Sequence, residues 1–586
     1  MRKFWRTASR SAHLPFIGIA EETLASFTAS GRALFYFFAG LLVVSSLGLL
    51  YILNTSLLVS TPGPGGMLEE GIVGSPRFIN PVLAISSADR DLVSLVYSGL
   101  LRATPEGEYL PSLAESFDVS SDGLVYTFIL RSDATFHDRT PVTARDIVFT
   151  ITKTQDPILK SPLRANWDGV GVEEIDVRTV RFTLKAPYAP FVKNLTLGIL
   201  PEHLWKSVSS EEFPFSELNS SPVGSGPFRV NSISRTTSGI LSAYDLRPFD
   251  NYVVHKPYIN RVVLRFYQSE EALIEALKNG DVSAASGISP ALIPELPYNI
   301  EIQRTPLNRV FGVFFNQNQS EVLRDKEVRE ALSNAIDRQK LVTNVLAGYG
   351  TPLTEPVPTN LPSGRLIVNS EEDLAQKARG ALLSAGWVPG ENGVLQKTTG
   401  SGTNKKTVML SFSLSTGNVP ELRAAAEELR ATWSQVGAAV EIHIYEQGDL
   451  SQNVIRPRKY DALLFGEVIG RELDLFAFWH SSQRNDPGLN IALYANTAAD
   501  RILEDLRKAV NTEERQALYE KFLAELEKDI PAVFLYAPDF VYSFPNDIKG
   551  LTLGFIAAPN DRFLSILEWH TETDYVWPFF ANDNTN

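Results

Sequence analysis

The sequence predicts an α/β protein whose folded part follows one membrane-spanning helix. Strand-like and helix-like segments alternate along the 586 residues, and residues 408–444 read as strand, helix and strand. Such a unit places its two strands parallel in one sheet, which is typical of α/β folds. Residues 33–53 contain no charge, and at ~1.5 Å per residue they are long enough for a hydrocarbon core of ~30 Å.

The charges around this apolar run predict its orientation. The basic residues before it are Arg2, Lys3, Arg6, Arg10 and Arg32, and the first charge after it is Glu69. The positive-inside rule then predicts a cytoplasmic leader over residues 1–32, a transmembrane helix over 33–54 and an extracytoplasmic remainder. A cleaved signal peptide is the alternative, although its apolar region usually has about 7–15 residues. Residues 55–68 include TPGPGGM and are expected to form a linker, because prolines and glycines interrupt a helix.

Composition excludes several classes of function. The net charge is −14, from 54 basic and 68 acidic residues, whereas nucleic-acid binders need a concentrated basic surface. The chain has no cysteine, so disulfides, thiolate catalysis, cysteine-bound metals and a lipoprotein anchor are excluded. Its seven histidines include no pair at the i, i+4 spacing of a helical metal site. No metal site and no cofactor are therefore expected.

The individual elements follow from periodicity and capping residues. Strands are expected at 123–131 and 179–185, where β-branched and aromatic residues alternate with polar ones. A helix is expected at 269–280, with Ser269 as its N-cap and Gly280 just past its end. A second helix is expected to run without interruption from Asp325 to Gly348.

The segment FHDRTPVTARDIVFTI, residues 136–151, presents a choice between chemistry and structure. It sets His137 beside Asp138, a pair of side chains that can perform acid–base catalysis. Thr143 and Asp146, however, have the spacing of a capping box, in which each side chain bonds to the other residue's amide. This favours a strand-to-helix turn. An anchored extracellular hydrolase that uses His137 and Asp138 stays open as the enzyme alternative, and a sensor ectodomain as the signalling alternative.

Several motifs in order resemble one known family. Residues 111–151 resemble the signature region of the peptide/nickel-type (family 5) extracytoplasmic solute-binding proteins of ABC importers. Further segments resemble other landmarks of that family, namely INPVLA (79–84), PVGSGPFRV (222–230), VREALSNAIDRQKLV (328–342) and WHSSQ (479–483). The resemblance extends from about residue 69 to about residue 570.

The resemblance implies a two-lobed, periplasmic-binding-protein-like clamp of type II, cluster C, with an extra subdomain. Lobe I is then expected at 69–305 plus 539–576, with the subdomain at about 104–215, and lobe II at 312–532. The chain is expected to cross between the lobes near 306–316 and again near 530–538. Hinge motion would close the lobes over a ligand.

The resemblance also implies a function without catalysis. The chain would be a monomeric, membrane-anchored substrate-binding protein, single-pass, with its binding domain outside the cytoplasm. It would capture an oligopeptide or a similar small solute and deliver it to an ABC permease and ATPase complex. The sequence does not identify the ligand. It leaves open the length of a peptide ligand and whether the ligand is instead another solute, such as a metal chelate.

Seven residues are the candidates for ligand binding. Oligopeptide-binding members of the family carry an aspartate after the strand equivalent to 460–466, but Gly470 or Arg471 occupies that position here. Glu467, Glu472 and Asp474 are therefore the candidates to replace it. Three of the candidates also have a purely structural alternative. Phe315 and Trp479 could be core residues, and Asp474 could cap a helix. The complete set of ligand-binding candidates is Asn80, Phe315, Asn316, Glu467, Arg471, Asp474 and Trp479.

Overall fold

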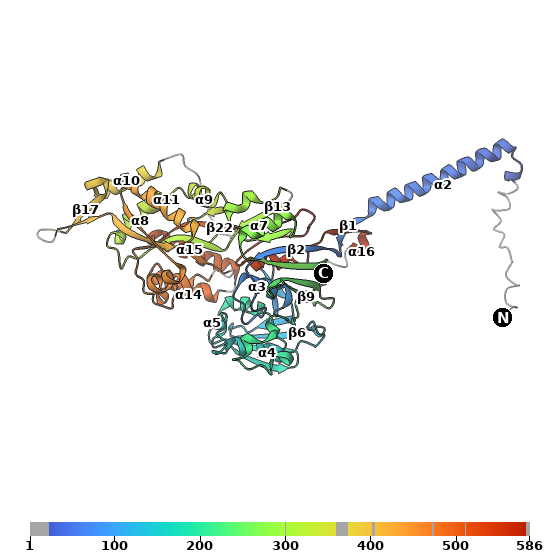
Figure 1. Ribbon diagram of the computed structural model, residues 1–586, viewed down its shortest axis with the longest axis horizontal. Helices are drawn as coiled ribbons and strands as arrows, with labels where there is room; N and C mark the ends of the chain where they lie inside the picture. Colours follow the sequence, from blue (N-terminus) through green and yellow to red (C-terminus); the bar gives the residue numbers. More distant parts are fainter. Residues whose placement is uncertain are drawn as a thin grey trace. The chain divides into compact units, whose positions relative to one another are not determined.

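The computed structural model describes residues 23–298, 300–358, 373–400, 405–470, 474–509 and 511–581. The chain forms two compact units (Figure 1). The larger unit contains Pro64–Thr571, and the smaller one combines the described residues up to Gly63 with those from Glu572 onward. Most of the cytoplasmic leader expected at 1–32 lies outside the described residues.

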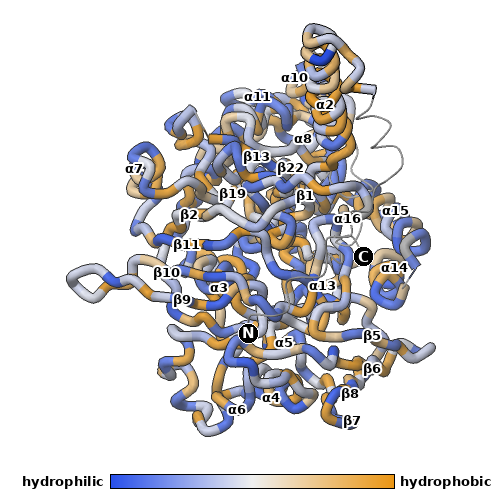
Figure 2. The backbone as a smooth tube through the Cα atoms, turned by 90° about the vertical axis from the view of Figure 1, so that its right-hand side faces the viewer, coloured by the Kyte–Doolittle hydropathy of each residue, from blue (hydrophilic) through white to orange (hydrophobic). Residues whose placement is uncertain are grey.

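The smaller unit contains one long apolar helix and a two-stranded sheet. Helix α2 spans Ala29–Leu57, begins at the N-cap Thr28 and contains the expected span 33–54. Its most apolar window has a mean hydropathy of 2.2 and buries no residue, so it suits either a membrane span or a signal sequence (Figure 2). Strand β1 (Val59–Gly63) pairs antiparallel with β23 (Glu572–Val576), and the short helix α16 spans Pro578–Ala581. The segment 61–67, expected to be part of a linker, instead belongs to β1 and to the start of β2 (Gly65–Val73).

A twelve-stranded mixed sheet is the framework of the larger unit. Its main path is β20-β19-β21-β14-β22-β12-β2-β11-β10-β9, and β13 and β15 also pair with β22. Strand β22 pairs with β14 through its first residues and with β13 through its last ones. The bounds after β2 are β9 Phe228–Arg235, β10 Leu241–Pro248, β11 Ile259–Tyr267, β12 Ala284–Ser286, β13 Ile300–Pro306, β14 Arg309–Phe315, β15 Gly350–Pro352, β19 Ser411–Gly417, β20 Ala439–Tyr445, β21 Ala462–Val468 and β22 Ala532–Pro545.

Two hydrophobic cores lie on opposite faces of β14 and β21, and we call the part of the chain around them, which includes β19, lobe II. One core is covered by α8 to α11 and the other by α13 to α15. These helices are α8 Lys326–Asn334, α9 Arg338–Leu346, α10 Leu374–Ser384, α11 Pro420–Val436, α13 Phe476–Trp479, α14 Thr497–Lys508 and α15 Thr512–Asp529. A small sheet of β16 Val388–Pro389, β17 Leu395–Thr399 and β18 Lys406–Met409 and the short helix α12 Gln447–Asp449 complete this lobe.

The remaining cores define lobe I and a subdomain. Lobe I contains the cores around β2, β9 to β12 and the last residues of β22, with α3 (Ser87–Val96) and α7 (Glu270–Asn279). The subdomain has its own core on a four-stranded sheet of order β5-β6-β8-β7. Its elements are β3 Leu101–Ala103, β4 Tyr109–Pro111, β5 Ala114–Val119, β6 Val125–Leu130, α4 Ala144–Gln155, α5 Arg164–Trp167, β7 Gly171–Asp176, β8 Thr179–Thr183, the 3-10 helix η1 Ala189–Thr196 and α6 Glu202–Trp205. The residue limits expected for the lobes stay a prediction.

Of three local predictions compared with the structure, two are confirmed and one is wrong. The helix at 269–280 is confirmed, since the Ser269 hydroxyl accepts from the Ala272 amide and Gly280 adopts a left-handed φ of 77° after α7. The strand–helix–strand unit is also confirmed, because β19 and β20 are parallel on either side of α11. The continuous helix at 325–348 is wrong. It is divided into α8 and α9, because Asp337 caps a new helix by accepting from the Lys340 amide at 2.9 Å.

A buried ionic network holds lobe I together. The Arg562 side chain is completely buried and donates to both carboxylate oxygens of Asp91, at 2.8 and 2.7 Å. It also donates to Glu70 at 2.8 Å, and the Tyr542 hydroxyl donates to the same carboxylate at 3.0 Å. Burial raises the pKa of Glu70, and the Arg562 charge opposes that rise. One cation thus joins α3, β2 and β22, which are distant in sequence.

We expect Arg562→Met to destabilise the larger unit strongly. Removing one member of a buried ion pair leaves its partners uncompensated and typically costs about 3–5 kcal/mol. Glu70 and Asp91 would both lose their cation. Thermal and urea unfolding followed by tryptophan fluorescence would show a lower midpoint. The control Lys278→Met removes exposed ion pairs with Glu275 and Glu295 and should hardly change the midpoint. Equal effects of the two substitutions would contradict this assignment.

Candidate functional site

The candidate site lies where the chain passes between the lobes, at the start of β14. Asn308 precedes this strand, and its amide donates to the carbonyl of Ile556 in lobe I at 2.9 Å. Its carbonyl accepts from the amide of Ile469 at the end of β21 at 2.9 Å, and its side-chain amide donates to the Ile469 carbonyl. Asn308 thereby connects lobe I to the segment that follows β21.

Glu467 lies on the same face of the sheet as Asn308. It stands opposite Val310 in the antiparallel pair of β14 and β21, and alternate residues of a strand point to one face. The side chain is buried, with 4% exposure. Neither of its carboxylate oxygens accepts a hydrogen bond from any described residue, and neither does Oδ1 of Asn308. Burial without a partner raises the pKa of Glu467 well above its ordinary value.

These oxygens define the chemistry of the site. Leaving a buried acceptor without a donor costs about 1–3 kcal/mol, and more for a charged group. Three such acceptors on adjacent strands suit a group that brings N–H donors and positive charge. Trp479, which belongs to the same hydrophobic core as Val310, is completely buried, and its ring lies 6.1 Å from Phe314 and 5.7 Å from Phe534 between centroids. Its indole N–H likewise has no acceptor among the described residues.

Three of the candidate residues already have partners elsewhere. Asn80 is buried in lobe I, where its side chain donates to Asn219 at 3.0 Å and accepts from the Val82 amide at 2.9 Å. Phe315 is a buried member of the lobe II core. Asn316 donates to the Arg458 carbonyl at 2.9 Å. Phe315 is five residues along β14 from Val310, or about 17 Å at ~3.3 Å per residue, so the structure does not bring it to Glu467.

Asp474 has several partners of its own. Its carboxylate receives two nitrogens of Arg507, at 2.9 and 2.7 Å, and the hydroxyl of Tyr188 at 3.1 Å. It also accepts from the Phe476 amide at 3.3 Å, as a cap of α13 would. The Arg507 guanidinium lies 3.9 Å above the Phe476 ring. The candidate Arg471 and the alternative Glu472 lie outside the described residues.

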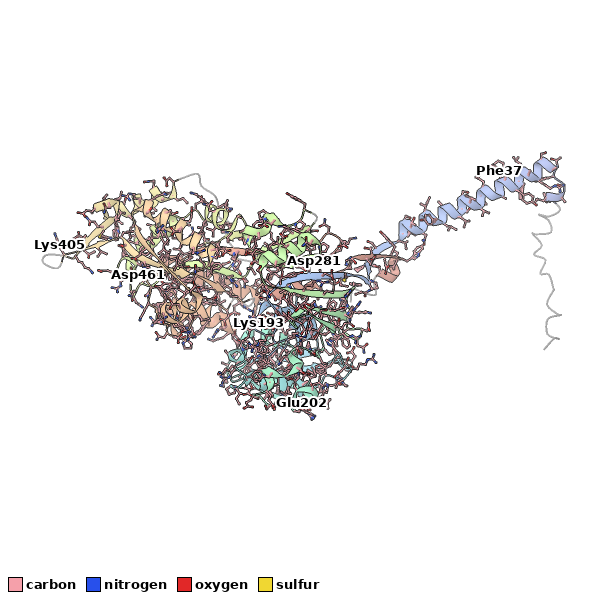
Figure 3. The ribbon with its side chains drawn as sticks, viewed as in Figure 1. Phe37, Lys193, Glu202, Asp281, Lys405 and Asp461 are labelled. Carbon is pink, nitrogen blue, oxygen red and sulfur yellow. The ribbon has the colours of Figure 1, made fainter. Side chains whose placement is uncertain are left out.

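The contact of Tyr188, Asp474 and Arg507, here called the interlobe contact, joins the subdomain to lobe II. Tyr188 precedes η1 of the subdomain, whereas Asp474 and Arg507 belong to the segment before α13 and to α14. Lys193 of η1, labelled in Figure 3, lies near Gly470, since a Cβ built there would be 3.2 Å from its Nζ. Sequence reasoning missed Asn308, Tyr188 and Arg507, because their partners are distant in the chain and no local pattern marks them.

The pair His137 and Asp138 does not form a catalytic dyad. The His137 Nε2 lies 3.0 Å from the Gly226 carbonyl, and its Nδ1 accepts from the Gly224 amide at 3.3 Å. Asp138 instead contacts His203 at 2.8 Å. Asp146 completes the expected capping box with Thr143 and accepts from the Thr143 amide at 2.8 Å. The segment is a strand-to-helix turn, and this geometry removes the basis of the hydrolase alternative.

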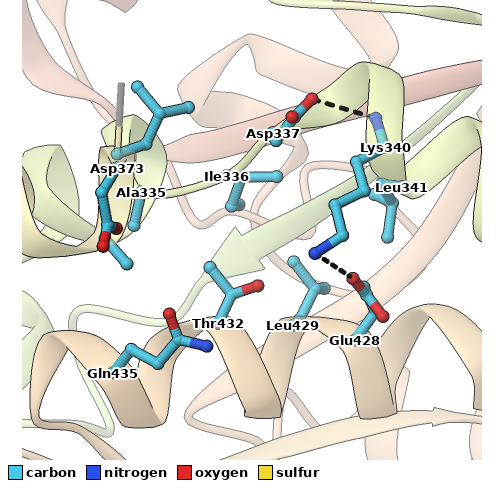
Figure 4. Close-up of a pocket in the computed structure, with 12 residues that line it drawn as sticks. Ala335, Ile336, Asp337, Lys340, Leu341, Asp373, Glu428, Leu429, Thr432 and Gln435 are labelled. Carbon is cyan, nitrogen blue, oxygen red and sulfur yellow. Dashed lines mark hydrogen bonds and ion pairs between the residues drawn. The ribbon is translucent and has the colours of Figure 1, made fainter. Parts of the chain in front are cut away.

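Lobe II has a cavity of about 450 Å³ between α8 and α10, and a smaller one that is below the usual size of a ligand site. It lies between α11 and the start of α9 and has a volume of about 160 Å³ (Figure 4). Ligand pockets usually enclose about 300–1,000 Å³. Asp337 already accepts from the Lys340 amide in this cavity, and the Lys340 ammonium pairs with Glu428 at 4.0 Å.

The environment of His137 predicts a pH dependence of stability. Burial lowers the pKa of His137 to about 4 from 6.5. Protons therefore bind the unfolded chain first, and stability present above pH 6.5 is lost as the pH falls toward 4, by at most about 3 kcal/mol. His137→Gln should flatten this part of the profile of unfolding midpoint against pH. His443→Gln, at a partly exposed position on β20, should leave it unchanged, and a steep profile in both variants would contradict the prediction.

Comparisons with known proteins agree with this architecture. The family model described as "Bacterial extracellular solute-binding proteins, family 5 Middle" matches residues 108–486. The oligopeptide-binding protein AppA of Bacillus subtilis (strain 168) is 27% identical over 509 residues, which cover 83% of this chain and 89% of AppA.

Two solved structures extend the likeness to the fold. AppA of Bacillus subtilis in complex with a nonapeptide has a TM-score of 0.64 and 26% identity, covering 87% of this chain and 99% of that one. NikZ of Campylobacter jejuni in complex with Ni(L-His) has the same TM-score and identity, covering 86% and 99%. The fold is the two-lobed α/β fold of periplasmic binding proteins. The chain therefore belongs to family 5 of the bacterial extracellular solute-binding proteins.

Proposed function

We propose that this protein is a membrane-anchored substrate-binding protein that captures a peptide-like solute between its lobes and delivers it to an ABC permease for import. Its role is binding, without catalysis. Membership of family 5 and the likeness to AppA, solved with a nonapeptide, support a peptide ligand. The apolar helix α2, with its length of 29 residues, supports a single-pass anchor.

The observation that carries the proposal is the group of buried acceptors at the lobe crossing. Both oxygens of Glu467 and Oδ1 of Asn308 accept from no described residue. A ligand ammonium group, such as the amino terminus of a peptide, supplies both the donors and the positive charge that these oxygens lack. Charge-assisted hydrogen bonds of this kind contribute about 1.5–3 kcal/mol each. Glu467 would thus orient the ligand by its amino end.

Strands β14 and β22 supply the connection that lobe closure needs. Ligand contacts in both lobes would favour the closed arrangement and shift the population toward it. The interlobe contact supports this role, because Tyr188 reaches Asp474 from the subdomain. We propose that it stabilises the closed arrangement and that Asp474 acts there, whereas Glu467 meets the ligand.

A metal chelate is the competing ligand class, since NikZ was solved with Ni(L-His). Over the described parts of the chain, no group of three His, Asp or Glu residues is placed to hold a metal ion. A bound metal would therefore arrive with ligands of its own. Thermal-shift screening that includes both peptides and nickel–histidine separates the two classes.

We expect peptides with a free amino terminus to raise the melting temperature, and N-acetylated copies to fail. A ligand at 100 times its Kd stabilises by about 2.7 kcal/mol. Glu467→Gln should weaken binding roughly 10- to 100-fold, the equivalent of about 1.4–2.8 kcal/mol. Because the raised pKa of Glu467 keeps it protonated at low pH, wild-type affinity should rise with pH, and the Gln variant should lose this rise.

The matched control for Glu467 is Glu441→Gln, an exposed position on β20, which should bind like the wild type. Equal binding of free and acetylated peptides would contradict the role of Glu467. Failure of every peptide and chelate to shift the melting temperature would contradict the proposed function itself.

We expect Tyr188→Phe to favour open lobes. The substitution removes the hydroxyl that donates to Asp474 at 3.1 Å, and a typical hydrogen bond contributes about 0.5–1.5 kcal/mol. Dyes on Glu202→Cys in the subdomain and Lys405→Cys in lobe II, both labelled in Figure 3, would report a longer mean distance by energy transfer. Ligand affinity should fall with the closed population. The control Tyr298→Phe, a fully exposed residue, should change neither quantity; an unchanged distance in Tyr188→Phe would refute the contact's role.

A further inference from the structure

The smaller unit brings the C-terminal part of the chain to the end of the apolar helix. Strand β1 begins two residues after α2, and Val59 stands opposite Val576 at that end of the ladder. The other end of the ladder is Gly63 opposite Glu572. Helix α16 follows β23 and contacts β1. Residues 575–581 therefore lie within a few residues of the point where α2 ends.

The spacing along α2 sets the depth of this ladder in a bilayer. The apolar run ends at Leu53, where Asn54 follows, and α2 continues through Leu57. Four more helical residues add about 6 Å, which is close to the thickness of one headgroup layer when the hydrocarbon core is ~30 Å and the whole bilayer ~40–45 Å. The pair Val59 and Val576 then lies at the outer part of the headgroup layer.

The residues of β23 change from aromatic near α2 to acidic farther from it. This is the order expected if the end near α2 lies at a membrane surface. Asp574 in the middle of the ladder and Glu572 at its remote end lie about 7 and 14 Å from Val576 at ~3.4 Å per residue. Tyr575 belongs to the near end and Trp577 follows β23 directly, with 68% and 36% exposure. The sequence of this end is YVWPFF, residues 575–580, in which four of the six residues are aromatic.

We propose that the aromatic end of β23, Tyr575 and Trp577, binds the headgroup region of the bilayer that α2 spans. This inference rests on the proposed anchoring by α2. Tyrosine and tryptophan gather at membrane interfaces, because one part of each ring system is apolar and the other forms hydrogen bonds. The C-terminal part of the chain is thus a second membrane contact. The pairing of β1 with β23 connects it to the first contact, which is α2.

The partner is the lipid interface itself and not an anionic headgroup. Glu572 and Asp574 are the charged residues of β23, and both are exposed. They repel anionic lipid, so the attraction comes from the aromatic rings and should be similar in zwitterionic and anionic bilayers. A permease or a second copy of this chain would be a different occupant, and the experiment below separates these from lipid.

Single-cysteine labelling tests the proposal on the full chain, which contains no cysteine of its own. An environment-sensitive dye is placed on Val576→Cys, on Thr573→Cys toward the acidic end of the ladder, or on Leu50→Cys within α2. Each protein is reconstituted without permease into phosphatidylcholine vesicles, with and without phosphatidylglycerol, that contain nitroxide lipids. We expect deep nitroxides to quench the dye at 50, shallow ones to quench the dye at 576, and neither to quench the dye at 573.

Substitution of the aromatic residues supplies the second arm. In the Val576→Cys protein, Tyr575→Ser with Trp577→Ser should reduce shallow quenching to the level seen at 573. The matched exchange Tyr575→Trp with Trp577→Tyr should keep it. The melting temperature of the larger unit should not change in either variant, and unchanged dye fluorescence at 573 should show that the ladder itself persists.

The outcomes separate this inference from the anchor on which it rests. A quenched dye at 50 with an unquenched dye at 576 overturns the aromatic contact and leaves the anchor intact. An unquenched dye at 50 overturns the anchor and the contact together. Quenching at 576 that survives the serine substitutions overturns the role of the two rings. Shielding at 576 that appears only when permease is added, or only as the protein concentration rises, overturns lipid in favour of a protein partner.

Discussion

The burial of one guanidinium group is the constraint on which lobe I depends. Arg562 is completely buried and can remain so only while Asp91, Glu70 and the Pro559 carbonyl accept hydrogen bonds from it. The Tyr542 hydroxyl completes this hydrogen-bond network by donating to Glu70. Because Tyr542 lies on β22, whose first residues belong to lobe II, the network also fixes the strand that both lobes share. A buried ion set of this kind demands correct geometry more than it adds stability.

The lobe crossing shows the opposite arrangement in the same chain. Around Arg562 every charge has partners, whereas Glu467 and one oxygen of Asn308 have none among the described residues. Folding alone does not favour such a group, because desolvation is not offset. Departures from internal consistency are typical of functional positions, where a ligand completes what the fold leaves unmet. Asp474, by contrast, already has its partners in Arg507 and Tyr188.

Local signals were readable from the sequence, and distant pairings were not. The caps of α7 and the parallel unit around α11 depend on neighbouring residues, and both were predicted correctly. The break between α8 and α9 is not evident from the sequence, because an aspartate can stand within a helix or cap one. The hydrogen bond from the Lys340 amide to the Asp337 side chain identifies the cap in the structure. Strand β1 and the start of β2 lie within the segment 55–68 that the sequence predicts to be a linker, because their partner strands are distant in the chain. For the site, the family resemblance directs attention to the segment after β21, but only the structure distinguishes Glu467, which has no partner among the described residues, from the paired Asp474.

The pairing of β1 with β23 has a consequence for how the protein is made. It joins Thr61 to Asp574, 513 residues apart. Strand β1, which follows the apolar helix, therefore cannot pair until β23 has been synthesised. The chain leaves the ribosome from its N-terminus, and β22, shared by both lobes, also arrives late. Until β23 has been synthesised, the first strand after the apolar helix has no partner and remains an open edge. Maturation of the two ends is therefore a single late event.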